Sequence, residues 1–135
     1  DERISFFNLG FSPNEPVDAE GLRKIAAYPF QTAFHAVDIN LSTEFCPERV
    51  AKLGSIADLL NPVWLEQDLG DWVFGDSYLG NHQVEPDLTL ASAQASGERV
   101  RKIQKTTGHC FLVENPPIYL PRGDLDMWSF LLAVG

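Results

Sequence analysis

Short apolar segments alternate with longer helix-periodic segments along the chain, and this alternation constrains the fold more than any other feature. The short runs are rich in Phe, Val and Ile, whereas the segments between them repeat apolar residues every three or four positions. Strands that alternate with helices in this way are typical of βα units, which lie side by side in a parallel sheet. The sequence therefore predicts an α/β fold.

Four strands and four helices are expected. The strands are predicted at 4–9, 32–37, 62–66 and 110–114, and the helices at 18–28, 47–60, 88–106 and from 124 onward. Asp18 is suited to cap the first helix, and Pro47 suits the first turn of the second. The loop 68–86 after the third strand is long and rich in Gly and aromatic residues, and such loops often carry function.

Four βα units are half of an eight-unit barrel, so the predicted architecture is a partial TIM-type (β/α) barrel. The 135 residues, 44% of them hydrophobic, show no change of composition, and we expect one partial barrel domain over 1–135. The chain begins with Asp1 and ends directly after an apolar run, which suggests the N-terminal half of a longer barrel or a shortened variant. Uncovered sheet edges would favour self-association.

Charge and cysteine usage narrow the classes of partner. The formal net charge is −9 without a Lys/Arg cluster, which argues against nucleic-acid partners. No apolar run approaches the roughly 20 residues that span a bilayer, so no membrane partner is expected. Cys46 and Cys110 lack CxxC spacing. A reducing, cytoplasmic location fits this pattern best.

Several polar side chains follow the predicted strands at their carboxyl ends, where barrel enzymes assemble their sites. They are His35, the group Glu66, Gln67 and Asp68, and Glu114 with Asn115. One imidazole and two carboxylates would suit iron, manganese or zinc. A structural histidine and a helix-capping glutamate would leave the same pattern, so spacing alone does not decide between them.

Three segments resemble motifs of the multinuclear non-haem iron-dependent oxidases, which are xylose-isomerase-like barrels formerly catalogued as a domain of unknown function. The run 34–42 is similar to the family's second-strand motif, leucine-histidine-glycine-valine-glycine, in which the histidine binds metal and matches His35. The run 112–120 resembles the fourth-strand motif, in which leucine-leucine-glutamate-asparagine is followed by tyrosine-leucine, and Glu114 takes the place of a metal-binding glutamate. The run 65–72 resembles the third-strand motif, in which serine, an acidic residue, histidine and leucine precede a tryptophan. In this match Asp68 stands where the family has histidine.

The resemblance implies that His35, Asp68 and Glu114 hold iron, of which the family binds two or three ions. It also implies oxidation of cysteine-containing peptides in the maturation of ribosomal peptide natural products. A precursor peptide and a peptide-delivering partner protein are expected by the same analogy. The family's remaining ligands belong to strands five to eight, which this sequence does not contain.

Two other functions stay open at this point. One is a divalent-metal sugar isomerase or epimerase, for which magnesium or manganese with all-oxygen ligands would be expected. The other is a decayed, non-catalytic barrel that acts as a binding module, favoured by aspartate at the motif-histidine position 68. Trp64 in the third strand and Trp72, Phe74 and Tyr78 in the long loop would line a peptide groove at the barrel mouth or, more commonly, form a local aromatic cluster. His82 in that loop would be a proton carrier or, more commonly, a surface residue.

Overall fold

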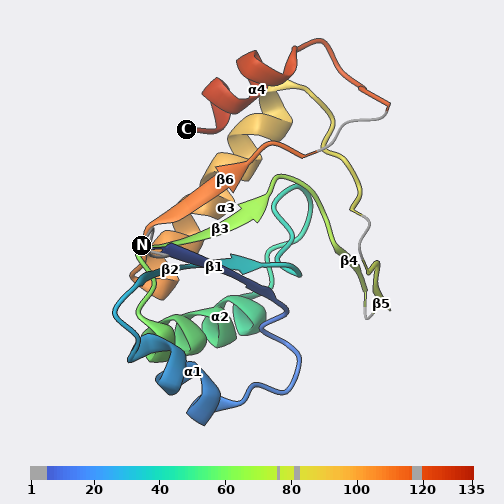
Figure 1. Cartoon of the computed structure of the whole chain (residues 1–135). Helices are drawn as coiled ribbons and strands as arrows, with labels where there is room; N and C mark the ends of the chain where they lie inside the picture. Colours follow the sequence, from blue (N-terminus) through green and yellow to red (C-terminus); the bar gives the residue numbers. More distant parts are fainter. Residues whose placement is uncertain (1–5, 76, 81–82, 117–119) are drawn as a thin grey trace.

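One parallel sheet organises the chain, and the computed structural model describes it over residues 6–75, 77–80, 83–116 and 120–135 (Figure 1). Its strand order is β1-β2-β3-β6, and every neighbouring pair is parallel. These strands are β1 (Phe6–Phe11), β2 (Gln31–Ala36), β3 (Trp64–Asp68) and β6 (Phe111–Glu114). The helices are α1 (Ala19–Ala26), α2 (Pro47–Leu60), α3 (Leu90–Thr107) and α4 (Met127–Val134).

The predicted α/β class is therefore confirmed, because four parallel strands alternate with four helices in the pattern of a partial TIM-type barrel. Parts of three expectations lie outside the described residues: the start of the predicted strand at 4–9, His82, and the tyrosine end of the fourth-strand motif at 117–119. Among the described residues, no helix combines the length and the apolar composition needed to cross a membrane.

Local helix signals in the sequence act as expected. The Asp18 side chain caps α1 by accepting a hydrogen bond from the Glu20 N–H at 3.1 Å, and Pro47 opens α2. The third helix begins two residues later than predicted because Thr89 is its N-cap and accepts from the Ser92 N–H. The last begins at Met127 because Asp126 caps it.

The third strand is displaced towards the carboxyl side of its predicted position. It was expected at 62–66 but runs from Trp64 to Asp68. Leu65 and Gln67 are both fully buried, which continues the strand alternation past the predicted end. Asp68 is consequently a strand residue on the same face as Glu66, and not the first residue of a loop.

The long loop after β3 contains a small antiparallel hairpin that the sequence did not predict, formed by β4 (Val73–Phe74) and β5 (Ser77–Tyr78). Asn40 anchors its first strand: its side-chain oxygen accepts from the N–H groups of Trp72 and Val73, and its amide donates to the Val73 carbonyl. Gly75 turns the chain with a φ of 53°. Two-residue strands lack the alternation from which strands are predicted.

The two faces of the sheet differ in burial. On one face Phe34, Leu65 and Phe111 are almost wholly buried against the helices, which pack on one another in chain order. On the other face Asn8, Gln31 and Leu112 are exposed. That second face would line the interior of a closed barrel, and it carries the predicted site residues.

Two helical glycines lead to a first prediction. In α3 a Cβ at Gly97 would lie 2.3 Å from the Val134 carbonyl oxygen of α4, whereas in α2 a Cβ at Gly54 would meet nothing closer than 3.6 Å, the Thr107 Cα. We expect Gly97→Ala to lower the free energy of unfolding by about 1–3 kcal/mol through overpacking. Gly54→Ala should raise it by about 0.5–1 kcal/mol.

Urea denaturation followed by circular dichroism measures both changes. Equal effects of the two substitutions would contradict the close approach of α3 and α4.

Candidate metal centre

The three predicted ligands lie at the carboxyl ends of neighbouring strands. His35 is the penultimate residue of β2, Asp68 ends β3 and Glu114 ends β6. In the strand register His35 pairs with Glu66, and Asp68 pairs with Glu114. Paired residues of parallel strands, and residues two apart on one strand, share a face. All four side chains therefore lie on the sheet face that no helix covers.

The tightest group of possible ligand atoms contains one residue outside the predicted set. His35, Glu66 and Glu114 each offer one atom, and these three atoms all lie within 4.8 Å of one another. Glu66 was recognised only as one of several polar residues near a strand end. Its position two residues before Asp68 would have identified it once the end of β3 was known.

Asp68 contacts this group of ligand atoms at the His35 imidazole. Its Oδ2 lies 3.3 Å from His35 Nε2, and the Gln67 side-chain oxygen lies 2.9 Å from that nitrogen. The pKa of His35 is raised above its ordinary value of 6.5, mainly by the hydrogen bond to Asp68. Burial of the imidazole lowers the pKa. The negative charges of Asp68 and Glu114 and the hydrogen bond to Gln67 raise it further. The protonated imidazole is therefore stabilised whenever no metal replaces its proton.

Glu66 is held by two neutral donors. The Asn8 amide donates to its Oε1 at 2.5 Å, and the Trp64 indole N–H donates to its Oε2 at 2.6 Å. The Phe6 ring stacks on Trp64 with a centroid distance of 5.0 Å, which fixes the indole. Each carboxylate oxygen keeps a second lone pair. Glu66 is thus oriented without being neutralised and stays available to a cation.

The donor set fits a divalent transition metal. An imidazole nitrogen with carboxylate oxygens suits iron, manganese or zinc better than magnesium, which prefers oxygen alone. Among the described residues, the ion pairs that involve Lys or Arg use other carboxylates than Glu66, Asp68 and Glu114. Three acidic groups around one imidazole carry an excess of negative charge that a bound cation would balance.

The aromatic residues of the predicted groove separate into different environments. Trp64 belongs to the group that holds Glu66. Trp72 is 9% exposed, whereas Phe74 and Tyr78 are about half exposed on the hairpin. Burial raises the pKa of Tyr78, and the negative charge of Asp38 adds to the shift. The four side chains thus differ in burial and in the elements that hold them, and the peptide groove stays a prediction.

The shifted pKa of His35 leads to a prediction for the metal-free protein. A pKa raised in the folded state adds stability that is fully present below 6.5 and is lost as the pH rises through the folded value. We therefore expect the midpoint of urea unfolding in EDTA to fall as the pH rises from about 6.5 towards about 8. Part of this fall should disappear in His35→Gln.

His109→Gln is the matched control, since His109 precedes β6 at the opposite end of the strand and contacts Asp58. A pH profile that His35→Gln leaves unchanged would contradict the coupling between His35 and Asp68.

No family model matches the chain, but a distant relative is found among known proteins. The relative is a "UPF0276 protein" of Caulobacter sp. (strain K31), to which the chain is 32% identical over 94 residues. The match covers 64% of this chain and 32% of the relative, so the chain spans about a third of that protein's length. The name of that protein states no activity. The similarity thus connects the chain to a longer protein without assigning a reaction.

Proposed function

We propose that this chain contributes part of the iron site of an oxidase that acts on cysteine-containing peptides, within a xylose-isomerase-like barrel. One observation carries the proposal: His35, Glu66 and Glu114 bring ligand atoms within 4.8 Å of one another on the uncovered sheet face. Motif resemblance at positions 35 and 114 supports the same assignment. Because the chain spans about a third of its relative, the activity belongs to the complete protein.

In this proposal His35 and Glu114 hold the metal together with Asp68, and Glu66 adds a further carboxylate. Bound iron would supply the activation of dioxygen and the affinity for substrate sulfur. The chain's own contribution is positional. Asn8 and Trp64 orient Glu66, while Gln67 and Asp68 hold the imidazole of His35.

The partners follow from the same proposal. The substrate would be a precursor peptide that contains cysteine, presented by a peptide-delivering partner protein. In a closed barrel the carboxyl ends of β2, β3 and β6 would lie at the barrel mouth, where such a segment would approach the metal.

A sugar isomerase or epimerase is the second candidate, and one observation favours it. Glu66, Asp68 and Glu114 put three carboxylates on one sheet face, which is a set of oxygen ligands that manganese or magnesium also accepts. The two candidates differ in the use of His35. Iron that depends on this imidazole supports the oxidase, and magnesium or manganese that binds without it supports the isomerase.

The test starts with metal-free protein under anaerobic conditions. Fe²⁺, Mn²⁺ and Mg²⁺ are titrated separately, and bound metal is measured by elemental analysis. We expect Fe²⁺ to bind most tightly of the three, in keeping with one nitrogen and several oxygen ligands. The complete protein, loaded with iron and exposed to dioxygen and a cysteine-containing peptide, should change the peptide's mass. Preference for Mg²⁺ would contradict the proposal.

A further inference from the structure

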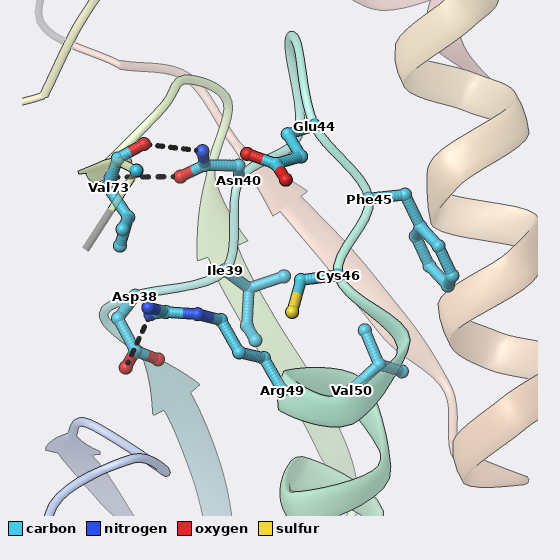
Figure 2. Close-up of a pocket in the computed structure, with 10 residues that line it drawn as sticks. Asp38, Ile39, Asn40, Glu44, Phe45, Cys46, Arg49, Val50 and Val73 are labelled. Carbon is cyan, nitrogen blue, oxygen red and sulfur yellow. Dashed lines mark hydrogen bonds and ion pairs between the residues drawn. The ribbon is translucent and has the colours of Figure 1, made fainter.

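A pocket of about 240 Å³ opens beside the carboxyl end of β2, separate from the metal-ligand group. The loop after β2, the first turn of α2 and β4 surround it. Figure 2 shows Ile39, Val50 and Val73 around it as apolar walls, with Asp38 and Arg49 together on one side. The pocket thus combines apolar side chains with two acidic residues, Asp38 and Glu44, and one basic residue, Arg49.

Asp38 is buried with half of its carboxylate unused. It is 3% exposed, and its Oδ2 accepts hydrogen bonds from the Ser12 hydroxyl at 2.5 Å and from the Asn14 amide. Its Oδ1 is also buried but has no hydrogen-bond partner among the described residues. A buried carboxylate oxygen without a donor is costly, so a donor from a ligand would be bound favourably.

Arg49 is the movable part of the pocket. Its guanidinium lies 3.5 Å from Asp38 Oδ2, which is long for a charge-assisted hydrogen bond, and its side chain is 26% exposed. Turning the guanidinium towards a ligand would uncover Asp38 on the pocket side and remove its cation, so the ligand's own N–H donor has to replace Arg49 at this buried carboxylate. Five N–H donors allow Arg49 to bind a carboxylate or a carbonyl oxygen.

The first turn of α2 adds positive potential beside Arg49. Cys46, which lines the pocket, is the N-cap of this 14-residue helix and makes no side-chain capping bond. The unpaired backbone N–H groups at the amino end of a helix attract an acceptor, and the Glu48 carboxylate in this first turn offsets part of that positive potential. Glu44 at the rim is exposed and favours a positively charged donor on the other part of the ligand.

We infer that this pocket binds the backbone of one α-amino acid with a small apolar side chain. The ligand's ammonium or amide N–H donates to Asp38 Oδ1, and its carboxylate or carbonyl oxygen accepts from Arg49. The side chain packs against Ile39, Val50 and Val73. A free amino acid and a residue within a peptide share this chemistry. The inference does not depend on a metal or on the proposed oxidase activity.

Four probes test whether the ligand needs both its ammonium and its carboxylate, and whether the ligand is a free amino acid or a residue within a peptide. L-valine carries both charges, isobutylamine lacks the carboxylate, isovalerate lacks the ammonium, and N-acetyl-valine-methylamide represents a residue inside a peptide. Binding to the purified full chain is followed by NMR chemical-shift changes. We expect L-valine or the blocked residue to bind at least about tenfold more tightly than both half-probes, as the loss of one charge-assisted contact predicts.

Variants locate the bound probe. Arg49→Met keeps the aliphatic part of the side chain but removes the charge. It should weaken the binding of L-valine about tenfold and leave the binding of isobutylamine unchanged. Lys52→Met, an exposed cation on the same helix, is the matched control and should change neither. Asp38→Asn should weaken both L-valine and isobutylamine, with folding checked by circular dichroism. Equal affinity for all probes, or L-valine binding that Arg49→Met leaves intact, would overturn the inference.

Discussion

Iron affinity should fall by roughly a hundredfold or more when His35 or Glu114 is replaced by alanine. Each would supply a direct ligand, and the loss of even an outer-shell partner costs about 10–100-fold in metal affinity. The structure adds Glu66 to the residues that should be tested, because its carboxylate belongs to the group of ligand atoms within 4.8 Å. Anaerobic Fe²⁺ titration with elemental analysis measures the change.

Position 68 gives the sharper comparison. If Asp68 stands where the iron oxidases that the sequence resembles have a metal-binding histidine, Asp68→His should retain or increase iron occupancy, whereas Asp68→Ala should reduce it. The contact of Asp68 with His35 at 3.3 Å allows a second explanation, in which the carboxylate only orients the imidazole. In that case Asp68→His would lose iron together with Asp68→Ala.

Asp58→Ala is the matched control for these substitutions. Asp58 is a carboxylate on α2 whose side chain is 77% exposed and whose neighbour is His109 at 3.7 Å. Its removal changes the net charge by the same amount as the removal of Glu66, Asp68 or Glu114, without touching the strand ends. Iron content that is equal in this control and in His35→Ala, Glu66→Ala and Glu114→Ala would favour the non-catalytic binding module.

Most of the fold was predictable because its signals are local or periodic. The N-cap at Asp18, the proline in the first turn of α2 and the apolar stripe of α2 depend only on nearby residues, and they placed these helices within two residues. The hairpin at β4 and β5 was missed for the opposite reason. Its position depends on Asn40, which lies 33 residues from Val73 in sequence, and such a contact has no local pattern.

The candidate site was predictable in its location but not in its full membership. Parallel strands bring their carboxyl ends to one edge, so His35, Asp68 and Glu114 were identified by topology. Glu66 depended on the register of β2 against β3, in which His35 pairs with Glu66. A shift of two residues in the assumed end of β3 was enough to hide this pairing.

Gln67 shows how the helix-covered side of the sheet supports the site. It is fully buried, its side-chain oxygen lies 2.9 Å from His35 Nε2 and accepts from the Asp68 N–H, and its amide donates to the Ile39 carbonyl. The Gln67 side chain therefore connects the His35 imidazole both to the end of β3 at Asp68 and to the loop after β2 at Ile39. The sequence suggested only a polar residue between two possible ligands, since the hydrogen-bond partners of a buried amide are set by tertiary structure.

Gln67→Leu should have two separable effects. It keeps the volume but removes the hydrogen bonds, leaving the Ile39 carbonyl and the Asp68 N–H without this partner, so we expect the free energy of unfolding to fall by about 2–4 kcal/mol. Iron affinity should fall by about 10–100-fold because the His35 ring loses a contact that orients it.

Gln104→Leu is the control, since Gln104 on α3 donates to the Phe111 carbonyl and has no contact with His35. Urea denaturation and Fe²⁺ titration of both variants measure these effects, with the ¹⁵N chemical shifts of His35 as a direct report of its protonation. Lower stability with unchanged iron affinity and unchanged His35 shifts would mean that Gln67 supports the fold alone and does not position the imidazole.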